Sequence, residues 1–385
     1  MKPKRKIFFP LTSRAYYGRM KVLLKELQEH PDIDLQIICT GALLVDRYGE
    51  KVLEDLEASG FKIQEKILSH IEGGNHVAMA KTAGLVALEA TNILQKLDPD
   101  IAVVCGDRSE VLAMTIAATY MNKPVAHIEG GDLSGSIDES VRHAITKLAH
   151  VHFVTNEDSR KRVVQMGENP KYVFNFGSPD VEFASLSDMK ITNEIVNNRG
   201  VGDHIDITKP FLTVIQHPVT TERDNFAHIE TTLDAVLEAG IPAIWFWPNN
   251  DAGTNEMSRK LREFHEKNLT NHGIRFILDL KPDDFTSLLK TTSCLVGNSS
   301  SGIKECSYFG TPVVNIGSRQ NGRTRGPNVI DVSTDKEEIK KAITAQLSHG
   351  PYPRSDIYYK PDTSKNIAAT LANIELYTQK SFHHA

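Results

Sequence analysis

The stretch Cys294-Leu295-Val296-Gly297-Asn298-Ser299-Ser300-Ser301-Gly302 indicates the fold of this chain most directly. An apolar run typical of a buried strand ends at Gly297, and small hydroxyl residues then open a helix-like segment that continues to Glu305. Unpaired N–H groups at a helix start, together with the helix dipole, favour a bound anion such as phosphate. Glu305, one turn in, could accept hydrogen bonds from ribose hydroxyls. The stretch therefore predicts either a nucleotide site or an ordinary serine-rich helix cap.

The same succession of a short apolar run and a longer amphipathic run repeats along most of the chain. Strands are predicted at 7–11, 34–39, 61–67, 101–105, 124–128, 211–215, 242–246, 274–278 and 294–297. Helices are predicted at 16–28, 43–59, 76–97, 111–121, 140–149, 222–239, 255–268, 283–289 and 363–379. Such alternation is typical of parallel strands joined by helical crossovers, so the predicted fold class is α/β.

A polar segment interrupts this pattern at about residues 185–209 and predicts a connection between two domains. We expect an N-terminal Rossmann-like domain at 1–185, completed by the C-terminal segment 363–385. A second Rossmann-like, nucleotide-binding domain is expected at 186–362. Two doubly wound domains facing a cleft would bind a ligand outside the carboxyl ends of their strands.

Composition restricts the class of protein. The 385 residues suffice for two domains, and 40% hydrophobic with 24% charged residues fit a soluble globular protein. The net charge of -5, without a long basic block, gives nucleic-acid binding little support, and no uninterrupted apolar run of membrane-spanning length is present. The four cysteines are scattered and form no Cys-x-x-Cys pair, which predicts reduced core residues in a cytoplasmic protein.

Three acidic residues follow predicted strands of the first half. Asp107 comes after the strand that ends at Cys105, Glu129 follows the next strand, and Asp138 is close by in sequence. Carboxylates grouped together shift one another's pKa values, so that one can serve as a base and another as an acid. Each also has an ordinary structural role open to it, because acids often bind loop amides and Asp138 lies in a capping-box pattern.

His217 follows a predicted strand of the second half, and Pro218 turns the chain there. A histidine at this place could contact phosphate or transfer a proton. His143 lies in a predicted helix with Arg142 and Lys147, and it fits a packing role as well as a functional one.

Several residues are suited to binding a nucleotide, and most of them follow predicted strands. Guanidinium groups match phosphate oxygens, which makes Arg14, Arg108 and Arg319 candidate phosphate ligands. Asn249 could bind a base or a sugar. No metal-ligand spacing, Gly-x-Gly-x-x-Gly fingerprint or Walker-type Gly-Lys-Ser is present, so no metal or nicotinamide cofactor is expected.

Taken in order, these segments resemble the UDP-N-acetylglucosamine 2-epimerases, and among them the hydrolysing branch that begins sialic acid and related nonulosonate synthesis. The matching strings are Ser13-Arg14-Ala15, Cys105-Gly106-Asp107-Arg108, His127-Ile128-Glu129-Gly130-Gly131, the run from Ile137 to Lys147, Gln216-His217-Pro218-Val219-Thr220-Thr221, Asn298-Ser299-Ser300-Ser301-Gly302 and Phe309-Gly310-Thr311-Pro312-Val313.

The resemblance implies a fold like that of the GT-B glycosyltransferases, no cofactor, a nucleotide-sugar substrate and a cytoplasmic homo-oligomer, dimer or tetramer. The catalytic residues it implies are Asp107, Glu129, Asp138 and His217. The substrate-binding residues it implies are Arg14, Arg108, His143, Asn249, Ser299, Ser300, Glu305 and Arg319. One departure is Tyr16, which stands where related enzymes often carry an acidic residue and which points to a different sugar.

The implied reaction removes the C2 proton of UDP-N-acetylglucosamine, expels UDP, and hydrates the resulting 2-acetamidoglycal to N-acetylmannosamine. Three alternatives stay open within this family: a GDP-sugar substrate, a UDP-2,4-diacetamido-trideoxyhexose of the legionaminic acid route, and a non-hydrolysing epimerase that adds UDP back. A GT-B glycosyltransferase is the alternative from another class, and a nucleotide-sugar sensor is the non-enzyme alternative.

Overall fold

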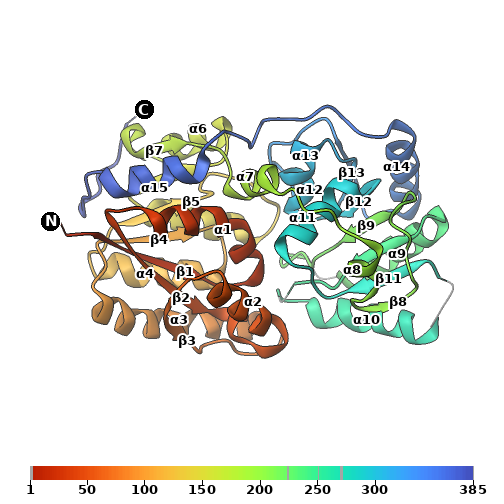
Figure 1. Ribbon diagram of the computed structural model, residues 1–385, viewed down its shortest axis with the longest axis horizontal. Helices are drawn as coiled ribbons and strands as arrows, with labels where there is room; N and C mark the ends of the chain where they lie inside the picture. The colour runs from red at the N-terminus through yellow and green to blue at the C-terminus, as the bar shows by residue number, and fades with distance from the viewer. Residues whose placement is uncertain (1–2, 223–224, 250, 269–271, 385) are drawn as a thin grey trace. The chain divides into compact units, whose positions relative to one another are not determined.

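The computed structural model describes residues 3–222, 225–249, 251–268 and 272–384. The chain divides into two compact units, each with its own seven-stranded sheet (Figure 1). Unit 1 comprises Met1–Asp132, Asp138–Phe183 and Tyr358–Ala385, and unit 2 comprises Leu133–Ile137 and Ala184–Ile357.

The sheet of unit 1 has the strand order β3-β2-β1-β4-β5-β6-β7, and all its neighbouring strands are parallel. Its strands are β1 (Arg5–Leu11), β2 (Ile33–Thr40), β3 (Ile63–Ile67), β4 (Ile101–Cys105), β5 (Val125–Ile128), β6 (Val151–Val154) and β7 (Val173–Asn175). Its helices are α1 (Arg14–Glu29), η1 (Gly41–Leu44), α2 (Asp46–Ala58), α3 (His76–Leu97), α4 (Ser109–Tyr120), α5 (Ile137–Leu148), α6 (Glu157–Gln165), η2 (Pro170–Tyr172), α7 (Pro179–Leu186) and α15 (Thr363–Asn373).

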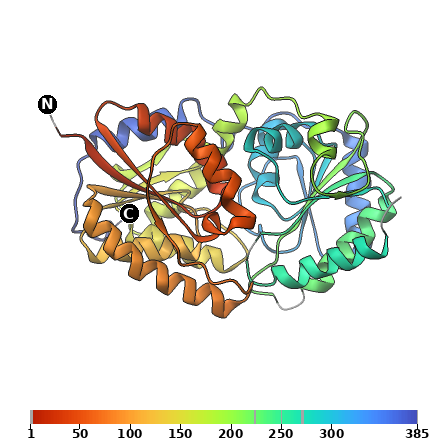
Figure 2. The same cartoon turned by 60° about the horizontal axis from the view of Figure 1, so that its bottom comes forward.

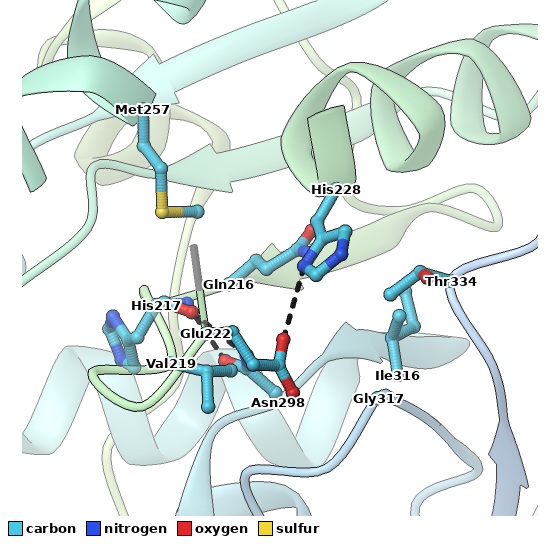
Figure 3. A pocket seen from close by; sticks show the side chains of 10 residues that line it. All are labelled: Gln216, His217, Val219, Glu222, His228, Met257, Asn298, Ile316, Gly317 and Thr334. Carbon is cyan, nitrogen blue, oxygen red and sulfur yellow. Dashed lines mark hydrogen bonds and ion pairs between the residues drawn. The ribbon is translucent and has the colours of Figure 1, made fainter. Parts of the chain in front are cut away.

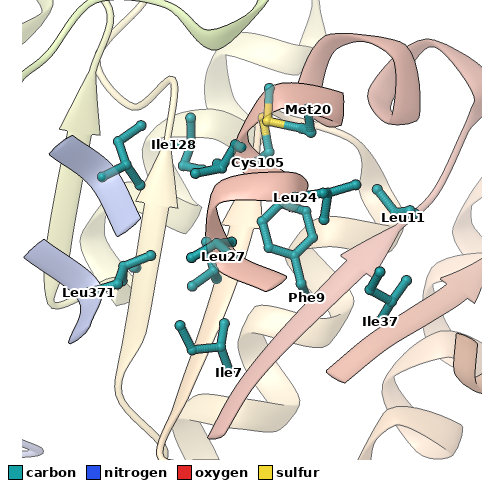
Figure 4. Packing of buried hydrophobic residues seen from close by; sticks show 14 of the residues in the cluster. Ile7, Phe9, Leu11, Met20, Leu24, Leu27, Ile37, Cys105, Ile128 and Leu371 are labelled. Atoms are coloured by element: carbon teal, nitrogen blue, oxygen red, sulfur yellow. The ribbon is translucent and has the colours of Figure 1, made fainter. Parts of the chain in front are cut away.

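Both faces of this sheet are covered, which explains why its strands are continuous apolar runs. In β4, Ile101 and Val103 enter the core cluster that α1 and α15 cover, while Ala102 and Val104 enter the one that α3 and α4 cover. Figure 4 shows the first cluster, in which side chains of the strands meet those of α1 and one of α15. Alternation of side chains across each strand therefore fills two cores with one sheet.

The C-terminal helix α15 belongs to unit 1 although all of unit 2 precedes it in sequence. Its Ile367, Ala368 and Leu371 are buried in the cluster of α1. The Arg5 guanidinium donates to the carbonyl oxygens of Leu371 (2.6 Å) and Ile374 (2.8 Å), which satisfies the last turn of the helix.

The sheet of unit 2 has the order β14-β13-β12-β9-β10-β11-β8 and is parallel except at β8. Its strands are β8 (Val201–Gly202), β9 (Leu212–Ile215), β10 (Ala243–Phe246), β11 (Ile274–Ile277), β12 (Cys294–Gly297), β13 (Val313–Ile316) and β14 (Val329–Val332). Its helices are α8 (Asn193–Asn197), α9 (Asn225–Ala239), α10 (Thr254–Lys267), α11 (Pro282–Thr291), α12 (Ser300–Ile303), α13 (Glu305–Phe309) and α14 (Lys336–His349). Of the helix predicted at 222–239, residues 223 and 224 lie outside the described residues.

The structure differs from the sequence-based expectation in several segments. The elements that were not predicted include the strands β6, β7, β13 and β14 and the helices α6, α7 and α14. The stretch 185–209 is polar but ordered: it carries α8 and β8, and Arg275 donates to the carbonyl oxygens of Val196 (3.1 Å) and Arg199 (2.9 Å). The last helix ends at Asn373 and not at 379, because the residues beyond it bind elsewhere. Tyr377 donates its hydroxyl to the carbonyl oxygen of His150 at 2.9 Å.

Candidate functional site

The carboxyl ends of β4 and β5 bring two predicted acids together in unit 1. The strands pair in parallel with Cys105 opposite Ile128, so the residues that follow them leave the sheet side by side. Asp107 follows β4 and Glu129 follows β5 directly. Both charges act on Tyr16, which places both near one side chain of α1.

Asp107 is held from two sides. Its carboxylate forms an ion pair with Arg142 of α5, and its Oδ1 lies 3.5 Å from the Tyr16 hydroxyl. The backbone N–H of Asp107 also points to that hydroxyl, at 3.4 Å. Burial, then Asp107, raises the pKa of Tyr16 well above its ordinary value, so the phenol stays protonated and can donate to the carboxylate.

Glu129 has a backbone that side chains rarely adopt. Its φ is 71°, in the left-handed region, where a non-glycine residue is strained by about 1–3 kcal/mol. Its carboxylate pairs with Arg19 of α1, whose guanidinium also lies 3.1 Å from Asp180. Burial opposes the charge of Arg19, but Glu129 and Asp180 outweigh it and raise its pKa well above the usual range. A strained backbone of this kind is common at active sites and ligand-binding sites.

Asp138 lies in the first turn of α5 and contributes to the charge around Arg142. Arg142 is buried, with 1% of its surface exposed, and donates to the carbonyl oxygen of Asp132 at 2.9 Å. Burial disfavours the Arg142 charge, and Asp107, Asp132 and Asp138 together reverse this and raise its pKa. The positive charge of one buried guanidinium therefore balances the charges of three acidic residues.

The other predicted residues of unit 1 lie at helix starts or on a helix surface. Arg14 is the first residue of α1, which follows β1. Arg108 occupies the N-cap position of α4, and its Nε lies 3.3 Å from Glu110 Oε2. His143 faces Glu139 one turn away on α5, at 4.0 Å, and burial lowers its pKa.

In unit 2 the predicted residues follow four adjacent strands. His217 follows β9, Asn249 follows β10, Ser299 and Ser300 follow β12, and Arg319 follows β13. These strands run in the order β13-β12-β9-β10, so their polar loops lie along one edge of the sheet.

His217 and Asn298 connect two of these loops. The His217 N–H donates to Asn298 Oδ1 at 2.8 Å, and Asn298 Nδ2 donates to the His217 carbonyl oxygen at 2.9 Å. The Asn249 N–H donates to His217 Nδ1 at 3.2 Å, which fixes that ring nitrogen as an acceptor. Burial, then Arg319, lowers the pKa of His217 to about 3, so the ring is neutral near pH 7 and its Nε2–H can donate.

The serine segment is shorter than a full helix. The helix α12 has four residues, and α13 begins again at Glu305 after Lys304. Ser299 accepts from the Ser301 N–H at 3.3 Å, so it acts as a helix cap here. Arg319 donates to the Asn298 carbonyl oxygen at 3.1 Å, which places its guanidinium at the serine segment. Ser299 therefore caps this helix, which is compatible with a phosphate contact of its hydroxyl, and Ser300 and Arg319 are further candidate phosphate donors.

A small pocket lies beside these loops (Figure 3). Its lining combines Gln216, His217 and Asn298 with Glu222 and His228, which face each other at 3.4 Å. The pocket thus holds both hydrogen-bonding and titratable groups. Its lining is completed by Val219, Met257, Ile316, Gly317 and Thr334.

Three residues of the unit 1 site were not assigned a role from the sequence alone: Arg19, Arg142 and Asp180. The contact of Tyr16 with Asp107 was not expected either. Arg19 and Asp180 follow no recognisable motif, although Asp180 comes shortly after β7. Among the residues that the structure describes, no three His, Cys, Asp or Glu side chains are grouped to hold a metal ion.

Comparison with known proteins identifies the family. The family model described as UDP-N-acetylglucosamine 2-epimerase matches residues 25–372. The chain is 36% identical over 376 residues to a UDP-N,N'-diacetylbacillosamine 2-epimerase (hydrolyzing) of Legionella pneumophila, covering 97% of both chains. It is 31% identical over 379 residues to a UDP-N-acetylglucosamine 2-epimerase of Neisseria meningitidis, covering 96% of both.

A Campylobacter jejuni GDP/UDP-N,N'-diacetylbacillosamine 2-epimerase (hydrolyzing) is 34% identical over 333 residues, with 85% of this chain and 84% of that one covered. Among solved structures, the Methanocaldococcus jannaschii UDP-GlcNAc 2-epimerase in complex with UDP-GlcNAc and UDP has a TM-score of 0.78 at 18% identity, covering 95% of this chain and 99% of that one. This structural likeness confirms the GT-B-like fold of two α/β domains. From its fold and these sequence matches, the chain is a member of the UDP-N-acetylglucosamine 2-epimerase family.

Proposed function

We propose that this protein is a hydrolysing 2-epimerase of a nucleotide-linked 2-acetamido sugar. A carboxylate removes the C2 proton, the C–H electrons form the C1=C2 double bond, and the C1–O bond breaks as the nucleoside diphosphate leaves. Water then adds its oxygen to C1, and a proton returns to C2 on the other face. The products are the free 2-epimeric sugar and the nucleoside diphosphate.

The observation that carries this proposal is the set of arginine-bound acids in unit 1. The C2 proton is weakly acidic, so its removal needs a positioned carboxylate base. Asp107 and Glu129 are both fixed by guanidinium groups and both border Tyr16. Asp138, which shares Arg142 with Asp107, is the third acid for the return of the proton.

The residues of unit 2 suit the departing diphosphate. Negative charge grows on it in the transition state, where fixed donors act most strongly. Arg319, the hydroxyl of Ser300 and the neutral His217 are the donors we assign to it, with Glu305 for the ribose. Closure of a lid over the bound substrate would keep water out of the elimination step.

For the sugar, the relatives favour a 2,4-diacetamido-trideoxyhexose carried by UDP. Two of them, at 36% and 34% identity, are named for diacetylbacillosamine. Tyr16 supports a sugar other than N-acetylglucosamine, because a neutral phenol lies beside Asp107 where related enzymes often carry a carboxylate. UDP-N-acetylglucosamine is the second candidate, since the relative at 31% identity is named for it.

The decisive experiment is proton NMR of the purified protein with each nucleotide sugar in deuterated water. We expect free 2-epimeric sugar, one equivalent of UDP, and deuterium at C2, with the diacetamido substrate turned over faster. Accumulation of the epimeric UDP-sugar would establish the non-hydrolysing reaction. Transfer to an acceptor without deuterium at C2 would establish a glycosyltransferase, and binding without turnover would establish a sensor.

The acids are tested by substitution. Asp107→Asn and Glu129→Gln should each lower kcat by about 10²–10⁴-fold, the usual effect of losing an acid or base, while UDP binding by calorimetry stays unchanged. Asp158→Asn, an exposed acid at the start of α6, is the control and should leave kcat as in the wild type. Near-normal turnover of both site variants would exclude these carboxylates from proton transfer.

A further inference from the structure

The segment Leu133–Ile137 is part of unit 2, although the chain before and after it is part of unit 1. Asp138 follows this segment directly and lies in the first turn of α5. It is the acid that we assign to the return of the proton. Because Asp138 is joined to the segment by one peptide bond, its position depends on how the segment is held.

The loop at residues 318–323 holds the segment. It follows β13 in the sheet of unit 2, whose two faces are both covered by helices (Figure 2). The Gly135 N–H donates to the Arg319 carbonyl oxygen at 3.0 Å, and Arg323 Nε donates to the Leu133 carbonyl oxygen at 3.2 Å. Arg323 is 8% exposed, so its side chain is largely withdrawn from water. Both hydrogen bonds engage backbone groups of the segment.

The segment and the loop fit together too closely for a side chain at one position. A Cβ built on Gly135 would lie 1.9 Å from the Ser318 carbonyl oxygen. The φ of Gly135 lies outside the left-handed region, so space and not backbone conformation requires a glycine here. On the other side of the contact, a Cβ built on Gly322 would lie 3.0 Å from the Leu133 side chain. The segment is therefore fixed in one position on the loop.

The same loop reaches the residues that we assign to the diphosphate. The Arg319 guanidinium and Gln320 Nε2 both donate to the Asn298 carbonyl oxygen, at 3.1 and 2.9 Å. Asn298 directly precedes the serine segment. Arg319 thus contacts the serine segment with its side chain and the segment before Asp138 with its backbone. An anion held by this arginine and the position of that acid share one loop, which is the physical link that coupling requires.

We propose that Arg323 and Gly135 are positioning residues for the reaction. They hold the segment 133–137 on the loop 318–323, so that the diphosphate bound by Arg319 sets the position of Asp138. This inference rests on the proposed function. Neither positioning residue is assigned a contact with the substrate, yet displacing an acid by about 1 Å can lower a rate by about 10²-fold.

Substitution of the two residues tests the proposal. Arg323→Met, which keeps bulk but removes the donor, should lower kcat by about 10- to 100-fold and leave the Kd of UDP by calorimetry within about twofold. Arg323→Lys should recover part of the turnover, because an ammonium can still donate to the Leu133 carbonyl oxygen. Gly135→Ala leaves Arg323 intact and should lower kcat in the same way, because the added Cβ displaces the segment.

Two matched controls accompany these variants. Arg259→Met changes an exposed arginine of α10, and Gly84→Ala adds a Cβ to α3 where no atom lies within 4 Å. Both should keep the kcat of the wild type. Circular dichroism verifies that every variant is folded.

A double-mutant cycle separates a positioning role from a structural one. In an Asp138→Asn background, Arg323→Met should lower the residual kcat by less than about twofold, since the group that it positions is already inactive. An arginine needed only for folding would lower kcat by the same factor in both backgrounds.

Hydrogen exchange followed by mass spectrometry tests the link without turnover. UDP should slow amide exchange in peptides covering 133–140 and 298–305 of the wild type, and only in 298–305 of Arg323→Met. The inference is overturned if UDP leaves 133–140 of the wild type unprotected, if folded Arg323→Met and Gly135→Ala keep the wild-type kcat, or if the effects at Arg323 and Asp138 multiply. A wild type that shows this protection but turns over no nucleotide sugar would refute the proposed function and leave the link between loop and segment in place.

Discussion

At the scale of single residues, the unit 1 site depends on side chains that hold the acids in place. Tyr16 is the clearest case, because its hydroxyl meets both the carboxylate and the backbone N–H of Asp107. The Arg19 guanidinium lies 5.4 Å from the centre of the Tyr16 ring and pairs with Glu129. One tyrosine thus adjoins both acids that we assign to proton transfer.

Tyr16→Phe should lower kcat about tenfold and move the acid limb of the pH–rate profile to higher pH. The carboxylate of Asp107 loses a donor that favours its ionised form, and a hydrogen bond of this kind is worth about 1 kcal/mol. The control is Tyr17→Phe, which removes a hydroxyl that lies 3.3 Å from Ser59 and should leave the profile unchanged. A Tyr16→Phe profile identical to that of the wild type would contradict a role for the hydroxyl.

His127 should make the stability of unit 1 depend on pH. It is fully buried in β5, its Nε2 donates to the Gly106 carbonyl oxygen at 2.8 Å, and burial lowers its pKa to about 3. The unfolded chain therefore binds a proton below about pH 6.5 that the folded chain refuses, so stability falls as the pH falls from 6.5 towards 3.

We expect His127 to account for about 2 kcal/mol of the stability lost between pH 7 and pH 5. His127→Gln should lower stability at pH 7 but show a loss on acidification smaller by that amount, measured by urea unfolding at both pH values. The exposed His204, changed to Gln, provides the comparison. An unchanged loss in His127→Gln would show that the imidazole is not the responsible group.

At the scale of elements, the turn from β4 to α4 is fitted to α1. Gly106 has φ of +74°, and a Cβ built on it would lie 2.0 Å from the Tyr16 hydroxyl. Strand, turn and helix thus meet at a place where only a glycine leaves room for the tyrosine. The chain offers a comparison at Gly240, which has φ of +67° but open space around a built Cβ.

Gly106→Ala should destabilise the protein by several kcal/mol and reduce turnover, because it adds a steric clash with Tyr16 to the backbone strain. Gly240→Ala carries the strain alone and should cost about 1–2 kcal/mol without affecting turnover. Melting temperatures and kcat of the two variants measure the difference. Equal effects on stability and no effect of Gly106→Ala on turnover would show that Tyr16 moves aside freely.

At the scale of the whole molecule, unit 1 is closed by the end of the chain. The helix α15 buries Leu371, which is 0% exposed, in the core cluster that α1 and the sheet share (Figure 4). The tail beyond it is fixed by Lys380, whose ammonium lies 2.8 Å from the buried Glu168. The first domain in sequence can therefore be complete only after the second has been synthesised.

Leu371→Ala should lower the free energy of unfolding of unit 1 by about 2–5 kcal/mol, as expected for a leucine in a core. Leu68→Ala, at an exposed position of unit 1, should change it by less than about 0.5 kcal/mol. Denaturant unfolding followed by circular dichroism measures the free energy of unfolding of both variants. A small effect of Leu371→Ala would mean that α15 contributes little to the core.

By itself, the sequence determined the α/β class, most of the strands and helices, and the position of several polar candidates after a strand. It did not indicate the strands β6, β7, β13 and β14. The features that it determined are local: they depend on apolar runs, helical periodicity and turn residues. Parallel strands place all their carboxyl ends at one edge of a sheet, so these candidates were expected on one edge. Asp107 and Glu129 adjoin because β4 and β5 are also neighbours in that sheet.

Only the tertiary structure decided which charges pair. Arg19 and Glu129 are 110 positions apart, and Arg142 and Asp107 are 35 apart. Arg19 reaches Glu129 because β1, which precedes α1, is separated only by β4 from β5, which Glu129 follows. Arg142 reaches Asp107 because α5 follows β5, the strand beside β4. No periodicity in the sequence specifies that order. The left-handed backbone of Glu129 and the return of α15 to unit 1 likewise depend on packing between distant segments, which local patterns do not encode.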